Sequence, residues 1–257
     1  MGSETGPPLS LRQREGPALP TELRRRGFPD DARSIACVVE RPHGSFAVVR
    51  IAVLGATGTI GSAYVTQAIA EGHEVQALVR RADSLRSAPG LTVVVGDVRD
   101  PSAVARVLWQ CAAVVSAVGP RTNTPDAVAL LEATATNVIT AMRAQGLTRV
   151  IFVAGAGLAL PGERRTLGQR TVSALVRRLA KWVVAAKERE LALYLESGLD
   201  WTAVRPPRVV GGAPTGRARL THDRPSGLRV SSGDVAAAIA AALADPGTVR
   251  KAPYVST

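Results

Sequence analysis

From residue 48 onward, the chain alternates between short apolar runs and longer segments in which apolar residues recur every three or four positions. The short runs are rich in Val, Ala and Ile, which is typical of strands buried on both faces of a sheet. Strands are predicted over residues 49–54, 74–79, 92–97, 112–118, 149–155 and 201–206. Helices are predicted over residues 60–71, 101–108, 125–144 and 171–197, and the end of the chain adds a short strand near 218–222 and a helix over 235–243.

Strands that alternate with helices of this length form βαβ units, which wind right-handed into a parallel sheet with helices on both faces. The sequence therefore predicts an α/β fold with a doubly wound parallel sheet over residues 48–257. Residues 1–47 contain many Gly, Pro and mixed charges without apolar periodicity, so we expect a disordered or loosely docked N-terminal extension. A start codon placed too far upstream is the alternative explanation of this segment.

The composition fits one globular domain with a sizeable core, since 46% of the 257 residues are hydrophobic and 21% are charged. The net charge of +11 is compatible with binding to nucleic acid, with an anionic ligand, or with an arginine-rich source. No nucleic-acid motif is present and the aromatic residues do not interleave with the basic ones, so no nucleic-acid partner is expected. No apolar run reaches the roughly 18 residues of a membrane span, so no span is expected.

The two cysteines, Cys37 and Cys111, are far apart and fit no metal-ligand or CxxC spacing. They are therefore interpreted as reduced structural thiols, and no metal site is expected. Because the N-terminus also lacks the apolar region of a secretory signal, we expect a cytoplasmic protein.

The segment VVRIAVLGATGTIG, residues 48–61, places Gly55, Gly58 and Gly61 where the first strand ends and the first helix begins. Here the first glycine permits a tight turn, the second lets a pyrophosphate approach the backbone, and the third lets the helix pack against the strand. The phosphates then meet free N–H groups at the positive end of the helix dipole. The pattern predicts a dinucleotide site, and a glycine-rich turn without a ligand is the alternative.

The end of the second strand distinguishes NAD from NADP, because an acidic residue there holds the ribose 2′-hydroxyl whereas arginine accommodates a 2′-phosphate. The predicted strand over 74–79 continues directly into Arg80 and Arg81. The sequence therefore favours NADP(H). The alternative is that these arginines only form a solvated loop, since the nearby Asp83 could complicate the site.

The ends of the third and fourth strands supply the rest of a cofactor groove, since ligands bind at the carboxyl ends of strands in such sheets. Asp97 could accept a hydrogen bond from the adenine amino group, with Val98 against the ring. Asp97 could instead cap the following helix, a role that we assign to Asp100. Three residues at the end of the fourth strand would line the ribose and the pyrophosphate, namely Ala117, Val118 and Gly119.

These residues resemble the atypical short-chain dehydrogenase/reductases of the NmrA-like and biliverdin-reductase-B-like type. The resemblance covers residues 49–257 and rests on GATGTIG, LVRR, GDVRD, SAVG, ESGLDWTAVRPP and SSGDVAAAI. It implies an NADP-binding Rossmann-type domain with a small C-terminal substrate lobe, formed mainly by residues 156–182 and 207–232. The residues expected to bind the cofactor are Gly55, Thr57, Gly58, Thr59, Ile60, Arg80, Arg81, Asp97, Val98, Ala117, Val118, Gly119, Ala154, Lys187 and Pro206.

Ordinary members of this family reduce ketones with a Tyr-x-x-x-Lys motif and a Ser at the preceding strand end. Lys187 matches the lysine, but Val183 stands at the tyrosine position and Ala154 at the serine position. General acid catalysis is worth roughly 10²–10⁴-fold, so acceptors that stabilise their own negative charge, such as flavins, quinones or conjugated tetrapyrroles, fit better than ketones. Lys187 is the candidate catalytic residue, and a surface lysine beside Glu188 and Glu190 is the alternative.

Residues 162–187 carry seven basic side chains against the single acid Glu163, with apolar positions at helical spacing. Packing against the sheet or against a partner subunit explains this pattern. A mouth for an anionic planar substrate and attachment to a membrane surface are the alternatives.

We predict an NADPH-dependent reductase of a conjugated, quinone-like or flavin-like acceptor, with a small planar or anionic substrate and a monomeric or homodimeric state. A non-catalytic NADP(H) sensor that binds a protein partner is the first alternative, as the resemblance to NmrA-like proteins suggests. A non-redox isomerase or cyclase on the same fold is the second. The missing Tyr and Ser favour both alternatives, whereas the substrate lobe argues against a bare sensor.

Overall fold

The structure, a computed structural model, describes residues 48–160, 162–163, 178–222 and 227–257. The predicted N-terminal extension, Cys37 and the first part of the helix predicted over 171–197 lie outside these ranges. Cys111 lies within them as a free, buried thiol, and burial raises its pKa to about 12. This thiol therefore stays protonated and acts as a small core residue.

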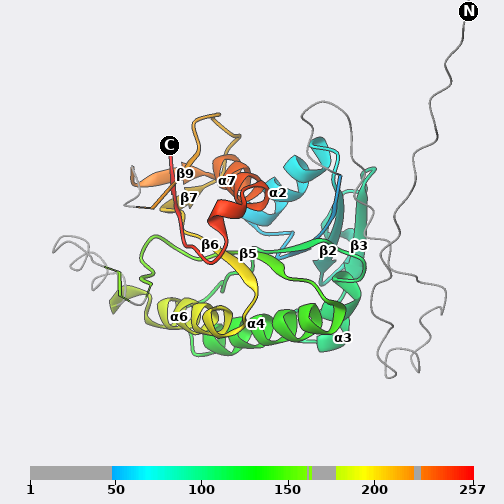
Figure 1. Cartoon of the computed structure of the whole chain (residues 1–257), viewed down its shortest axis with the longest axis horizontal. Helices are drawn as coiled ribbons and strands as arrows, with labels where there is room; N and C mark the ends of the chain where they lie inside the picture. Colours follow the sequence, from blue (N-terminus) through cyan, green and yellow to red (C-terminus); the bar gives the residue numbers. More distant parts are fainter. Residues whose placement is uncertain (1–47, 161, 164–177, 223–226) are drawn as a thin grey trace, which may run out of the picture.

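A six-stranded sheet forms the centre of the molecule (Figure 1), with the strand order β3-β2-β1-β4-β5-β6 and parallel pairing throughout. The strands are β1 (Arg50–Leu54), β2 (Glu74–Val79), β3 (Leu91–Val95), β4 (Ala113–Ser116), β5 (Arg149–Val153) and β6 (Asp200–Val204). The order reverses between β1 and β4, which is the switch point of a doubly wound fold. The predicted Rossmann-type α/β sheet is confirmed.

Helices cover both faces of this sheet (Figure 1). One face carries α3 (Pro101–Val107), α4 (Asp126–Gln145) and α6 (Lys181–Glu196), and the other carries α2 (Thr59–Ala70) and α7 (Ser232–Ala244). The described residues also contain two short 3₁₀ turns, η1 (Ala82–Ser84) and η2 (Pro246–Thr248). Asp100 caps α3 by accepting a hydrogen bond from the Ser102 amide at 2.9 Å, as predicted.

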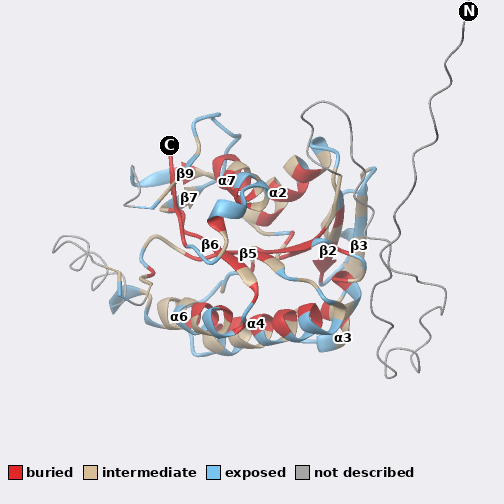
Figure 2. Ribbon diagram, viewed as in Figure 1, coloured by how far each residue is buried: buried red, intermediate tan, exposed pale blue. Residues whose placement is uncertain are grey.

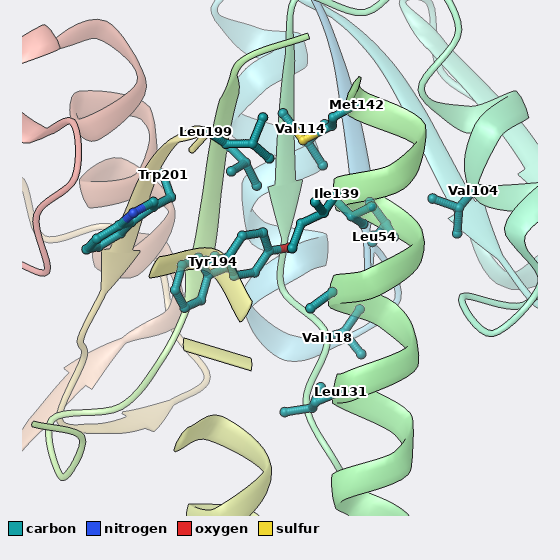
Figure 3. Close-up of a cluster of buried hydrophobic side chains, with 14 of the residues drawn as sticks. Leu54, Val104, Val114, Val118, Leu131, Ile139, Met142, Tyr194, Leu199 and Trp201 are labelled. Carbon is teal, nitrogen blue, oxygen red and sulfur yellow. The ribbon is translucent and has the colours of Figure 1, made fainter. Parts of the chain in front are cut away.

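The alternation of side chains along β1 explains why its sequence reads as a continuous apolar run. Ala52 and Leu54 belong to the core beneath α3, α4 and α6, whereas Ile51 and Val53 belong to the core beneath α2 and α7. All four are fully buried, and Figure 2 shows the sheet as a buried layer between the helices. In Figure 3, side chains of α4 point toward the sheet and meet Tyr194 of α6, whose ring stacks on Phe152 at 4.4 Å.

The C-terminal part of the chain adds two small sheets at one end of the domain. β7 (Arg208–Val210) pairs in parallel with β9 (Arg229–Ser231), and β8 (Arg219–Thr221) pairs antiparallel with β10 (Tyr254–Ser256). The pattern of the sequence predicted only the strand near 218–222. The other three were missed because a strand of three residues contains too little of a repeat to be detected.

A side chain from another segment of the chain caps helix α6 at its start, Lys181. Asn123, in the loop before α4, accepts hydrogen bonds from the amides of Trp182 at 2.9 Å and Val183 at 3.3 Å. Its side-chain amide donates to the Leu179 carbonyl at 3.0 Å. The loop that follows β4 is therefore attached to the start of α6.

Candidate functional site

A pocket of about 290 Å³ lies at the carboxyl ends of β1, β2, β3 and β4. This is the edge at which open α/β sheets bind their ligands, on both sides of the switch point. The structure brings together nine of the residues predicted to bind the cofactor, namely Gly55, Thr57, Gly58, Arg80, Asp97, Val98, Ala117, Val118 and Gly119.

Close backbone contacts require glycine at two of the three glycine positions in the first turn, Gly55 and Gly61. Gly55 has a φ of +76°, and a Cβ atom there would lie 2.7 Å from the carbonyl of Ala117. A Cβ atom on Gly61 would lie 2.1 Å from the carbonyl oxygen of Gly55, so the helix and the strand could not pack as they do. A Cβ atom on Gly58 would meet that same oxygen at 3.3 Å, which is tight but tolerable.

The turn leaves the start of α2 accessible to an anion. Gly58 is the N-cap residue, and no side chain caps the helix. Helix N-termini without a side-chain cap have free N–H groups and a positive dipole end, both of which favour phosphate. The fit between this cradle and a pyrophosphate is the physical support for a dinucleotide cofactor.

The two arginines after β2 have different surroundings. Arg80 lines the pocket and forms no ion pair with any residue in the described part of the chain. Arg81 lies outside the pocket, with its Nε 3.8 Å from a carboxylate oxygen of Asp83, and both side chains are exposed. Asp83 therefore pairs with Arg81, and the guanidinium group of Arg80 remains available to bind a 2′-phosphate.

Two charged residues that the sequence analysis missed form one wall of the pocket. Arg99 Nη2 lies 2.7 and 2.8 Å from the two carboxylate oxygens of Asp126, and both residues line the pocket. Asp97 accepts a hydrogen bond from the Arg99 amide at 2.8 Å, which holds the loop after β3 in a turn. The ion pair joins that loop to the start of α4. The motif GDVRD includes Arg99, but its ion-pair partner Asp126 lies 27 residues further along the chain, where no local pattern links the two.

The remaining predicted residues do not line the pocket. Thr59 and Ile60 form the first turn of α2. Ala154 donates its amide to the Val204 carbonyl at 2.8 Å, and Pro206 accepts at 2.9 Å from the amide of Ala156. The pairing of β5 with β6 thus continues beyond the sheet at its ligand-binding edge. Contact of these residues, of Arg81 and of Lys187 with the cofactor stays a prediction.

Lys187 lies on α6 and ties the ends of two strands together. Its Nζ donates to the carbonyls of Val118 at 3.0 Å and Val153 at 2.7 Å, and to Glu190 Oε2 at 2.9 Å. An ammonium group has three N–H donors, so all of them are engaged. Only 13% of the lysine side chain is exposed, which excludes the alternative of a surface lysine.

Glu190 is fully buried, and the sequence analysis did not foresee this. Burial raises the pKa of its carboxyl group, an effect that the neighbouring Lys187 opposes. Among the described residues, Glu190 Oε1 has no hydrogen-bond partner, nor do the buried hydroxyls of Tyr194 and Ser116. The burial of Glu190 could have been anticipated from the spacing of residues 187, 190 and 194, because this spacing places all three side chains on one face of a helix.

The structure places no tyrosine in the pocket. Tyr64, Tyr194 and Tyr254 are at most 2% exposed, and none lines the pocket formed by the described residues. Val183, at the expected tyrosine position, lies one turn before Lys187 in α6.

A buried polar cluster that the sequence analysis also missed follows the end of β6. Arg205 is 2% exposed and donates to Glu163 Oε2 at 2.8 Å and to the carbonyls of Leu158 and Ala252. Tyr254 donates to the other oxygen of Glu163 at 3.1 Å. Burial by itself raises the pKa of Glu163, but hydrogen bonds from Arg205 and a backbone amide outweigh it and lower the pKa. This cluster holds the loop after β5 against β6.

Two further features of the described residues bear on the site. They contain no group of three or more His, Cys, Asp or Glu side chains arranged to hold a metal ion. None of their helices combines the length and the apolar character that crossing a membrane requires.

A family model for NAD(P)H-binding proteins matches residues 55–246, from the glycine turn to the end of α7. The chain belongs to the NAD(P)H-binding family. A curated relative, the 3-beta-hydroxysteroid dehydrogenase of Mycolicibacterium neoaurum, is 25% identical over 175 residues, which are 63% of this chain and 48% of the relative. The chain thus spans about half the length of that curated relative.

Two solved structures share this fold at low sequence identity. ChuY, an anaerobillin reductase from Escherichia coli O157:H7, superposes with a TM-score of 0.66 at 23% identity, over 80% of this chain and 96% of ChuY. A short-chain dehydrogenase/reductase from Veillonella parvula in complex with NADP gives a TM-score of 0.66 at 19% identity, over 81% of this chain and 94% of that one. The predicted membership of an NAD(P)H-binding family and its nicotinamide dinucleotide cofactor are confirmed.

Proposed function

We propose that this protein reduces a conjugated acceptor, such as a quinone or a flavin, with NADPH. The observation that carries the proposal is the environment of Lys187. Its three N–H donors are all engaged with protein oxygens, and no tyrosine lines the pocket. Among the described residues, the site therefore offers neither a tyrosine nor a free lysine N–H to protonate an alkoxide.

The preference for NADPH rests on Arg80, which lines the pocket without an ion-pair partner in the described part of the chain. The glycine cradle and the start of α2 would hold the pyrophosphate. Gly119 and Val118 would lie along the ribose next to it. When bound, NADPH supplies the hydride, and the chain's own residues bind and orient the two reactants.

Lys187 acts in this proposal as a positioning residue. By bonding the carbonyls of Val118 and Val153, it fixes the ends of β4 and β5, and Val118 lines the pocket that would hold the cofactor. A quinone or flavin delocalises the charge that it receives, so it needs no strong protein acid. An unconjugated ketone lacks this property.

The test is steady-state oxidation of NADPH with a panel of quinones, flavins and unconjugated ketones. We expect turnover with the conjugated acceptors and negligible turnover with the ketones. Efficient reduction of ketones would contradict the proposal, because it requires a proton donor in the site. Tight NADPH binding without turnover of either class would instead favour an NADP(H) sensor or a non-redox enzyme.

A further inference from the structure

Two arginines stand directly opposite each other in the small sheet that follows β6. In the parallel pairing of β7 with β9, Arg208 is in register with Arg229, and both are exposed. Like charges placed opposite each other destabilise a sheet. Neither side chain forms an ion pair or a hydrogen bond with any residue that the structure describes. The sheet thus sets two arginines opposite each other, and the described residues provide neither of them with an anionic partner.

The face that carries these arginines also offers apolar surface. Val209 and Val230 pack into the core beneath α7, so the arginines lie on the opposite face of β7 and β9. Val210 is two residues after Arg208, which places it on that same face, and it is 37% exposed. A ligand on this face would meet cationic and apolar groups together.

The strand that carries Arg208 begins at the ligand-binding edge of the main sheet. The amide of Ala156 bonds the Pro206 carbonyl at 2.9 Å, which continues the β5–β6 pairing beyond the sheet, and Arg208 follows two residues later. The loop after β7 is fixed to α7, since the amide of Thr215 donates to Asp234 at 2.7 Å. The arginine pair is therefore carried on a rigid support next to the ends of β5 and β6.

We propose that Arg208 and Arg229 bind the anionic group, a phosphate or a carboxylate, of the acceptor that this protein reduces. The inference rests on the proposed reductase function and adds the property that its acceptor is an amphiphilic anion. A guanidinium group binds such oxyanions through two parallel N–H donors, and two adjacent guanidinium groups can share one anion. Binding of the anion would also relieve the repulsion between them.

FMN and riboflavin form a matched pair of probes, because they share one ring system and differ in a phosphate. Binding of each oxidised flavin is measured by fluorescence titration with NADP⁺ at saturation, which keeps the flavin phosphate away from Arg80. We expect FMN to bind about tenfold more tightly than riboflavin, as charge-assisted contacts at an exposed site allow. Raising the salt concentration should weaken only FMN binding.

The double variant R208Q/R229Q should bind FMN and riboflavin equally, with the affinity for riboflavin unchanged. It should melt no lower than the wild type, since it removes two opposed charges. R219Q is the matched control, because Arg219 is an exposed arginine of the same region but lies in β8, which pairs with β10 instead. This control should keep the preference for FMN.

Equal affinities of the wild type for the two flavins would overturn the inference, and so would a preference for FMN that survives in the double variant. Absence of any FMN binding would also overturn it. The proposed reductase function is tested separately, by NADPH turnover. An arginine-dependent preference for FMN without turnover of any acceptor would support the anion site while contradicting the reductase.

Discussion

Lys187 and Glu190 form an ion pair at 2.9 Å in which the carboxylate is fully buried. The lysine reaches from α6 to the ends of β4 and β5, and one of its acceptors, the carbonyl of Val118, belongs to a residue that lines the cofactor pocket. A buried ion pair stabilises a fold little relative to apolar residues, but removing one partner leaves an uncompensated charge. The pair is therefore a positioning device whose two halves depend on each other.

This dependence predicts a non-additive pair of substitutions. Lys187→Met should lower the free energy of unfolding by about 3 kcal/mol, because it leaves the Glu190 carboxyl buried without a cation. Adding Glu190→Leu should recover most of that loss. Urea denaturation of both single variants and the double variant measures the coupling. A double variant no more stable than Lys187→Met would show that the pair does not act as a unit.

The raised pKa of Glu190 predicts how stability varies with pH. Because the pKa of Glu190 is higher in the folded state, the folded protein retains a proton that the unfolded protein releases. The contribution of this group to the stability of the fold is therefore complete below the ordinary pKa of glutamate and is lost as pH rises through the pKa of the folded state. Glu190→Gln stays neutral and avoids this loss. The melting temperature of Glu190→Gln relative to that of the wild type should therefore rise from about pH 4 toward neutral pH.

Thermal melts over this pH range provide the measurement. Glu196, which is exposed near the end of the same helix, supplies the matched control, and Glu196→Gln should show no such trend. A constant difference between Glu190→Gln and the wild type across the range would contradict a raised pKa.

The different surroundings of the two arginines after β2 predict unequal roles in cofactor selection. Arg80→Gln should weaken NADPH binding about tenfold and leave NADH binding nearly unchanged, because it removes a charge-assisted contact with the 2′-phosphate. Arg81→Gln should have a much smaller effect, since Arg81 lies outside the pocket beside Asp83. Calorimetry with both cofactors checks this prediction. Equal NADPH and NADH affinities in the wild type would contradict it.

The contacts of the glycines predict that a substitution at Gly61 lowers the stability of the fold, whereas a substitution at Gly58 weakens cofactor binding. Gly61→Ala should destabilise the fold by about 1–3 kcal/mol, because its Cβ would lie within 2.1 Å of the Gly55 carbonyl oxygen. Gly58→Ala should alter the melting temperature little yet weaken NADPH binding, since its Cβ occupies the approach of the pyrophosphate. Gly211→Ala, where a Cβ would meet nothing within 4 Å, is the control for stability. Unchanged NADPH binding by Gly58→Ala would place the pyrophosphate elsewhere.

The sequence by itself determined the main sheet, its two covering layers and the glycine turn. A strand such as β1, with Ile51 to Leu54 buried on alternate faces, must read as a continuous apolar run. Gly55 and Gly61 were recognisable because a tight strand-to-helix turn excludes a side chain at both positions. Such signals are local, since each depends on residues within a few positions of one another.

The tertiary structure alone decided which charged groups meet. Lys187 bonds a carbonyl 69 residues earlier in the chain, and Arg99 pairs with a carboxylate 27 residues later. The register that sets Arg208 against Arg229 likewise joins two strands of three residues. These contacts depend on how whole elements pack, and no short-range pattern encodes that packing, so the same lysine reads equally well as a surface residue or as a buried one.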